Sequence, residues 1–311
     1  MKQNMQSRSV TLLELYDGDI SRLEKRIGKD RSRSTLSTLR QGRKYVAAFL
    51  TDQWKRKDIP VDELEPQLIE DFSIYLSAER GLRGGTVWLA CQHLKGVVTR
   101  ACQRGLLVKN PFSGFHIQKK IRPREFLTEE ELTRLMTHSF QRVTLARARD
   151  IFIFSALTGL SFIDIRELRP TNIVNIGGAA WIISRRHKTQ VPYQVKLLEV
   201  PLRIIRHYQK EGNEKVFGHL EYRTIAYQIR QVMEAMGYNK HITMHCARHS
   251  FAVLAINKGM PIESISRILG HTNITTTQIY AKITMQKLHE DMVAFEKSLS
   301  EMNKYDPESN E

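Results

Sequence analysis

The sequence predicts a mostly α protein of two domains, the second of which also carries a small antiparallel β-hairpin. Three observations lead to this fold class. Apolar residues recur at helical spacing along most of the chain and are interrupted by glycine and proline. A basic stretch at 116–125, which contains Pro123, has no helical period and indicates a linker. Two apolar segments, 181–184 and 193–197, flank a polar turn as paired strands do.

The first domain, residues 1–115, is expected to be a compact group of four helices. Turn-forming residues at Gly28, Pro60, 81–85 and Gly105 separate the helical patterns. The predicted helices cover residues 12–27, 35–54, 67–78 and 86–104.

The second domain, residues 126–300, begins with a clear helix signal. Thr128 and Glu131 have the spacing of a capping box ahead of an apolar run. Further helices are expected at 128–138, 146–157, around Asp164, and at 203–211, 222–236 and 285–295. A polar tail at 301–311 is expected to lack order.

The net charge indicates a polyanionic partner. The chain of 311 residues carries +15 at pH 7, with a pI near 9.8. Residues 1–57 alone hold fourteen Lys and Arg against six Asp and Glu, a net +8. DNA or RNA is the natural candidate, although a highly soluble protein with a basic surface is the alternative. The expected phosphate contacts are Arg43 and Lys44 in the first domain and Lys119, Lys120, Arg122 and Arg124 in the linker. A linker that is only solvated fits the sequence equally well.

The chain shows no sign of a disulfide framework, a metal site or a membrane span. Its three cysteines, Cys91, Cys102 and Cys246, have neither paired nor ligand-like spacing. Its longest apolar runs are far too short to cross a bilayer. We therefore expect reduced cysteines, no metal, no membrane partner and a cytoplasmic protein.

The segment from Thr243 to Tyr280 carries the chemistry. A helix capped by Thr243 places His245 and Arg248 three residues apart on one face and ends near Gly259. A second helix starts at Pro261 and stops at Gly270, so that His271 projects from a helix end. Asn273 or Thr275 is expected to cap a short helix that holds Tyr280.

Two histidines, an arginine and a tyrosine in this order suit phosphodiester chemistry. Cations must gather around a phosphorus whose oxygens gain charge as a nucleophile attacks, and Tyr280 would be that nucleophile. Each residue alone has a structural explanation, such as capping by His245 or packing by Tyr280. Together they favour an active site.

Residues 243–281 resemble the C-terminal signature of the tyrosine recombinases, or phage integrase family. The resemblance assigns catalytic roles to His245, Arg248, His271 and Tyr280. It also implies a lysine in a β-hairpin that protonates the leaving 5′ oxygen, and Lys188 fits that position, although a basic hairpin tip that only contacts backbone phosphate is the alternative. For the first domain it implies a SAM-like core-binding domain that grips DNA, and for the second the α-rich catalytic domain of the tyrosine recombinase fold.

One element of the family pattern is replaced. A catalytic arginine normally follows Thr-Gly-Leu, whereas this chain has Ser161 there and keeps an acidic residue at Asp164. A subgroup found in Bacteroides-type mobile elements resembles this variant. Because the pocket still needs positive charge, we expect Arg149 or Arg147 to substitute; a solvated first helical turn is the alternative for both.

The implied activity is site-specific recombination without metal or cofactor. Tyr280 would form a 3′-phosphotyrosyl bond, and a 5′ hydroxyl from a partner duplex would resolve it. The implied partners are double-stranded DNA with paired recombination sites, three further copies of the chain in a homotetramer, and accessory DNA-bending proteins. A catalytically silent DNA binder and a type IB topoisomerase-like enzyme are the alternatives. Integration, excision and inversion all stay open, and no arm-binding domain is expected ahead of the first helix.

Overall fold

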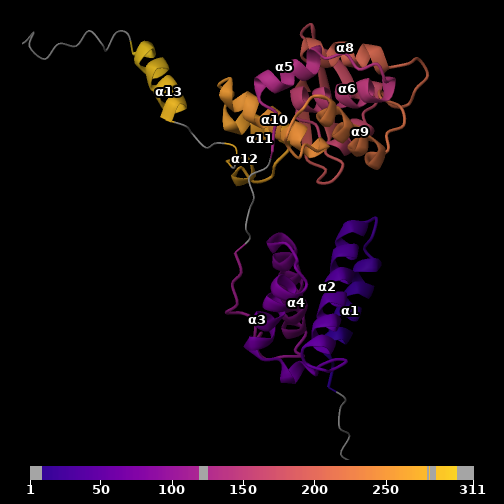
Figure 1. Cartoon of the computed structure of the whole chain (residues 1–311), viewed down its shortest axis with the longest axis vertical. Coiled ribbons are helices and arrows are strands. Elements are labelled where there is room, and N and C mark those ends of the chain that lie inside the picture. The colour runs from indigo at the N-terminus through magenta and orange to yellow at the C-terminus, as the bar shows by residue number, and fades with distance from the viewer. Residues whose placement is uncertain (1–8, 119–124, 279, 281–284, 300–311) are drawn as a thin grey trace, which may run out of the picture. The chain divides into compact units, whose positions relative to one another are not determined.

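The computed structural model describes residues 9–118, 125–278, 280 and 285–299. The chain divides into two compact units, Met1–Arg122 and Pro123–Glu311 (Figure 1). The predicted phosphate contacts at Lys119, Lys120, Arg122 and Arg124 therefore lie outside the described residues, as does the predicted tail from residue 301.

The first unit is a group of helices around one apolar core. Its elements are α1 (Leu12–Glu24), α2 (Arg33–Asp52), a 3-10 turn (Val61–Glu63), α3 (Pro66–Ile74), which continues into a π-helical turn (Tyr75–Glu79), and α4 (Gly84–Gln103). Tyr16, Phe49 and Phe72 are fully buried at its centre. The buried carboxylate of Asp19 ties α1 to α4 through Arg100 and Arg104, at 2.6 Å each. The four predicted helices are confirmed, with ends that differ by a few residues.

The second unit is built around one buried helix. Its elements are α5 (Glu129–Thr137), α6 (Val143–Thr158), α7 (Phe162–Arg166), a 3-10 turn (Pro170–Asn172), β1 (Ile173–Ile176), β2 (Ala179–Arg185), β3 (Pro192–Lys196), α8 (Glu199–Tyr208), α9 (Tyr222–Ala235), α10 (Met244–Asn257), α11 (Ile262–Leu269), α12 (Thr275–Gln278) and α13 (Met285–Ser298).

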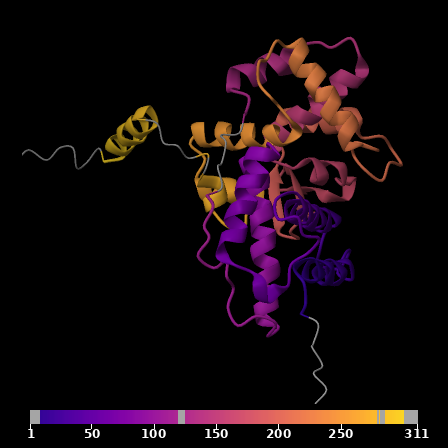
Figure 2. The ribbon, with the colours of Figure 1, turned by 60° about the horizontal axis from the view of Figure 1, so that its bottom comes forward.

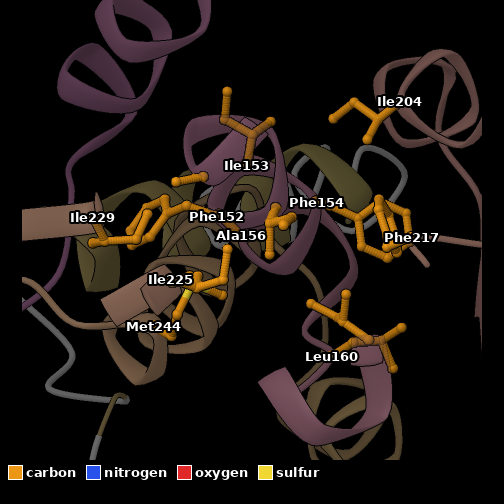
Figure 3. Close-up of a cluster of buried hydrophobic side chains, with 14 of the residues drawn as sticks. Phe152, Ile153, Phe154, Ala156, Leu160, Ile204, Phe217, Ile225, Ile229 and Met244 are labelled. Atoms are coloured by element: carbon orange, nitrogen blue, oxygen red, sulfur yellow. The ribbon is translucent and has the colours of Figure 1, made fainter. Parts of the chain in front are cut away.

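The second half of α6, from Ile151 to Ala156, is buried on all sides, because the helix packs against α5, α8, α9 and α10. Figure 3 shows Phe152 beside Ile229 of α9, and Phe154 directed at Phe217. The rings of Phe154 and Phe217 meet edge to face, with centroids 5.1 Å apart. This packing holds both ends of α6 in place, including the Thr-Gly-Leu segment that follows it.

The capping box predicted at the start of α5 is confirmed. The hydroxyl of Thr128 accepts the amide of Glu131 at 3.2 Å, and the Glu131 carboxylate accepts the amide of Thr128 at 2.8 Å.

The three strands form an antiparallel sheet in the order β1-β2-β3. The predicted hairpin is confirmed as β2 and β3, which are joined by a turn over residues 187–191. Strand β1 was not predicted, since its four residues are too few for a period-two signal. Helix α11 packs against β3 and α10, so the hairpin turn and the ends of these two helices meet in one region. Figure 2 gives a second view of the ribbon.

Candidate active site

Helix α10 presents its candidate residues to two different environments. Arg248 and His249 are buried, with 9% and 2% of their surfaces exposed, whereas His245 is exposed to solvent. The rings of His245 and His249 meet edge to face one turn apart, with centroids at 4.4 Å. Thr243 precedes the helix as expected, but its hydroxyl pairs with the Cys246 thiol at 3.3 Å rather than capping the helix.

Arg248 is held by two backbone carbonyls. It donates to the carbonyl of Gly159 at 2.9 Å and to the carbonyl of Leu269, the last residue of α11. Burial and the neighbouring Arg186 lower the pKa of Arg248 to about 10, so its guanidinium is still charged at neutral pH. The side chain is thus a cation that two backbone carbonyls hold in place.

Asp164 gathers three donors at the start of α7. Its carboxylate accepts the Ser161 hydroxyl at 2.7 Å, the guanidinium of Arg186 at 2.7 Å and the amide of His187 at 3.0 Å. Burial alone would raise the pKa of Asp164, but Arg186 and the other donors outweigh burial and keep the pKa below its ordinary value. The carboxylate is therefore ionised and anchors the hairpin.

Arg186 is the second buried cation of this region. Only 4% of its surface is exposed. Besides its bond to Asp164 it donates to the carbonyl of Ile268, and its guanidinium lies 4.0 Å from the centre of the Tyr193 ring. Among the described residues, none accepts a hydrogen bond from the buried Nε atom of Arg186.

The two guanidiniums are neighbours because Arg186 and Arg248 bind consecutive carbonyls, Ile268 and Leu269. These carbonyls end α11, where the helix dipole is negative and backbone acceptors lack helical partners. The end of one helix therefore holds two positive side chains from different elements side by side.

His271 follows directly, after the left-handed residue Gly270. Its Nδ1 is paired with the Thr277 hydroxyl of α12 at 2.8 Å. Burial, reinforced by Arg248 and Arg186, lowers the pKa of His271 to about 4. The imidazole is therefore neutral at physiological pH.

This depressed pKa predicts a stability change with pH. Unfolded histidine has a pKa of about 6.5, so between about pH 6.5 and 4 the unfolded chain binds more protons than the folded one. The free energy of unfolding should fall as the pH drops through this window. Urea denaturation at pH 7 and at pH 5 measures this fall. Between these two pH values, the free energy of unfolding of His271→Asn should decrease less than that of the parent. The variant His219→Asn, at an exposed position, should show the same decrease as the parent. An unchanged pH dependence in His271→Asn would contradict the assignment.

Tyr280 lies just beyond α12 and reaches back to α10. Its hydroxyl is hydrogen bonded to Nδ1 of His249, and the two ring centroids are 5.2 Å apart. The Tyr280 ring also packs on a small apolar cluster that includes Phe251 and Leu269. Asn273 turns the chain ahead of α12, because its carboxamide accepts the Thr275 amide at 2.9 Å.

Lys188 lies exposed in the hairpin turn, two residues after Arg186. The turn is closed by hydrogen bonds between Arg186 and Val191 and from Gln190 to Arg186, both 2.8 Å long. Arg186 is thus the buried anchor of the turn that carries Lys188.

Arg147 and Arg149 have other partners. Arg147 donates to the carbonyls of Phe217 and His219, and Arg149 binds Asp150 and the carbonyl of His138. These contacts tie α6 to neighbouring segments. Within the part of the chain that the structure describes, neither arginine has a hydrogen bond or ion pair to the cluster around Asp164 and Arg248.

In the first unit, the two candidate DNA contacts differ. Arg43 makes a bidentate ion pair with Asp17, at 2.6 and 2.7 Å, which raises the pKa of Arg43. Lys44 instead borders a hollow along α2, together with Arg33, Arg40 and Glu24. Lys44 is therefore in a more basic setting than Arg43.

At Gly270, both the backbone conformation and the packing of a neighbouring side chain disfavour any larger residue. Its φ is 62°, and a Cβ there would lie 2.8 Å from Nε of Arg186. Gly237 has a similar φ of 68° but open space around the same position.

We expect both glycine-to-alanine changes to cost about 1–2 kcal/mol through backbone strain. Gly270→Ala should cost more than Gly237→Ala, because it also pushes Arg186 off Asp164. Chemical denaturation of the two variants measures the difference, and equal losses would show that Arg186 can move at no cost.

Among the described residues, no group of three or more His, Cys, Asp or Glu side chains could hold a metal. In the same part of the chain, no helix is both long and apolar enough to cross a bilayer.

Comparison with curated proteins gives relatives over most of the chain. The tyrosine recombinase XerC of Oceanobacillus iheyensis is 26% identical over 301 residues, which cover 89% of this chain and 94% of that protein. A tyrosine recombinase of Thermosipho africanus is 25% identical over 268 residues, covering 82% and 92%.

Solved structures share the fold at lower identity. The Tn1549 transposon integrase in complex with circular intermediate DNA superposes with a TM-score of 0.73 at 17% identity, over 91% of this chain and 99% of that one. A lambda integrase dimer bound to a COC′ core site gives 0.69 at 18% identity, over 88% and 77%. These likenesses establish the predicted mostly helical fold.

Family models cover both units. Residues 11–121 match the phage integrase SAM-like domain, and residues 125–287 match the phage integrase family. The second match takes in every candidate from Ser161 to Tyr280 and spans more than half of the chain. The chain belongs to the phage integrase family.

Proposed function

We propose that this protein is a site-specific DNA recombinase that cleaves and rejoins DNA through a 3′-phosphotyrosyl intermediate. One observation carries the proposal. Arg186 and Arg248 are buried side by side at the end of α11, and the Tyr280 hydroxyl is fixed on the neighbouring residue of α10. Two fixed cations beside a phenol suit a phosphodiester that gains charge when it is attacked.

We assign the role of the missing arginine to Arg186 instead of Arg147 or Arg149. Arg186 is paired with the acidic residue of the family pattern, Asp164, and neighbours Arg248, whereas Arg147 and Arg149 bind elsewhere. Ser161 keeps a supporting role because its hydroxyl donates to Asp164. We place the chain in the Bacteroides-type subgroup on this substitution.

In the proposed reaction Tyr280 attacks the scissile phosphorus while Arg248 and Arg186 neutralise the non-bridging oxygens. The neutral His271 and the solvent-exposed His245 contact the phosphate and assist proton transfer. Lys188, at the tip of the hairpin, protonates the departing 5′ oxygen. The covalent bond keeps the phosphodiester energy, so a 5′ hydroxyl of the partner duplex can restore the backbone without a cofactor.

Residues 1–115 are proposed to grip the DNA, with 116–125 as the linker, 126–300 as the catalytic domain and 301–311 as a tail. Lys44 contacts phosphate directly, and Arg43 does so after exchange of its partner Asp17. Two duplexes with paired sites and four copies of the chain assemble in the cytoplasm, with accessory DNA-bending proteins. Solved structures of DNA-bound family members support a DNA partner.

Covalent trapping tests this function. The protein is incubated with nicked duplexes that span the inverted repeats flanking its gene, and denaturant-resistant adducts are digested and mapped by mass spectrometry. We expect a nucleotide-bearing peptide that contains Tyr280. Tight binding without an adduct would favour a silent DNA binder. Relaxation of a plasmid without these repeats would favour a topoisomerase-like activity.

A further inference from the structure

A second histidine of α10, His249, stands at the nucleophile in a position that the sequence pattern did not assign. Its Nδ1 pairs with the Tyr280 hydroxyl, while His245, the histidine of the family pattern, is one turn away and exposed. Only 2% of the His249 surface is exposed, so the imidazole is fixed by packing.

Nδ1 of His249 can act as the acceptor in its hydrogen bond with the Tyr280 hydroxyl. A neutral imidazole with its proton on Nε2 has a lone pair on Nδ1, and the phenol O–H then donates to it. The pair has the geometry of a nucleophile and its base.

We propose that His249 is the proton acceptor for Tyr280 in DNA cleavage. As the Tyr280 Oη to phosphorus bond forms, the phenolic proton moves to Nδ1 of His249. The bond from phosphorus to the 5′ oxygen breaks, and that oxygen takes a proton from Lys188. Rejoining reverses each transfer, so no proton is gained or lost over a full cycle.

The phosphate explains why a buried imidazole accepts this proton. In the free protein, a proton taken up by His249 would place a second positive charge beside the buried guanidinium of Arg248. The scissile phosphate brings one negative charge, and its oxygens gain more as Tyr280 attacks. The bound phosphate therefore favours the proton transfer, because its negative charge offsets the charge gained by His249.

This inference rests on Tyr280 as the nucleophile, so its test uses the DNA site that adduct mapping identifies. Single-turnover cleavage of that nicked duplex is compared for wild type, His249→Asn and His249→Ala. Asparagine still offers a hydrogen-bond acceptor near the Nδ1 position but takes up no proton. We expect both variants to slow cleavage by about 10²–10⁴-fold, with DNA affinity unchanged. His207→Asn is the matched control, since His207 meets the ring of Tyr208 edge to face outside the site.

Two modified reactants separate proton removal from mere positioning. A duplex with sulfur in place of the bridging 5′ oxygen needs no acid for its leaving group, so it should rescue Lys188→Ala but neither His249 variant. Ring-fluorinated tyrosine at position 280, which ionises without a base, should suppress the effect of His249→Asn. Parental cleavage by His249→Asn, or an equal loss with fluorotyrosine, would overturn the proposal. An adduct on another residue would instead overturn the proposed function.

Discussion

Tyr280→Phe is expected to abolish covalent adduct formation completely while leaving DNA affinity at the parental level. The substitution removes only the oxygen that would bond to phosphorus. The ring still packs on the apolar cluster with Phe251 and Leu269, so the fold should be kept. Arg186 and Arg248 are held by carbonyls and by Asp164 rather than by the phenol, so the phosphate site should persist.

Denaturing gels of the nicked-duplex reaction measure the adduct, and a mobility-shift titration measures binding. Tyr227→Phe is the matched control, because Tyr227 is an exposed tyrosine on α9, with 53% of its surface accessible. It should form adduct at the parental rate. Adduct formation by Tyr280→Phe would remove Tyr280 from the reaction.

Arg186→Ala should have the second largest effect, because it removes one of two cations from the phosphate. Loss of a single preorganised donor at a developing charge typically slows a reaction by about 10²–10³-fold. The change also leaves the buried carboxylate of Asp164 without its cation, which typically costs about 3–5 kcal/mol of stability. Cleavage is therefore measured well below the melting temperature of the variant.

Three comparisons test whether the slower cleavage of Arg186→Ala comes from the loss of this particular cation. Arg185→Ala removes the adjacent, exposed arginine of the same hairpin and should cleave at close to the parental rate. Arg147→Ala and Arg149→Ala should also cleave normally, since both side chains bind outside the cluster. Asp164→Asn combined with Arg186→Ala should recover stability but not cleavage, because the buried charge is gone while the phosphate still lacks its cation. Parental cleavage by Arg186→Ala would return the role to Arg147 or Arg149.

Most helices were predictable because their signals are local. The capping box at Thr128, the glycine at position 270 and the apolar spacing within α10 each lie within a few residues of the feature that they specify. Strand β1 and the π-helical turn after α3 depend on packing with distant segments. Sequence periodicity carries no information about such contacts.

In the candidate site, too, the features with local sequence signals were predictable and the contacts between distant residues were not. The order of His245, Arg248, His271 and Tyr280 is visible in the sequence, but the partner of Tyr280 is not. His249 directly follows Arg248, and helical spacing alone cannot tell which of the two histidines of α10 meets a residue beyond α12.

Arg186 was missed for a related reason. Arg185, Arg186 and Lys188 form one basic run, and only strand alternation distinguishes an inward side chain from an outward one. Strand alternation, continued one residue past the end of β2, places residue 186 on the same face as Ile182 and Ser184. Arg185 lies on the opposite face. That alternation was the available signal.

The pairing of Asp164 with Arg186 has a consequence for how such proteins are recognised. The carboxylate stays where the family pattern has it, while its cation is supplied from 22 residues further along the chain. A search that demands arginine directly after Thr-Gly-Leu would discard this protein as inactive, although the positive charge is present in space. Under the proposed function, the buried positive charge beside Asp164 is kept, although the residue that carries it, Arg186, stands at another position of the sequence.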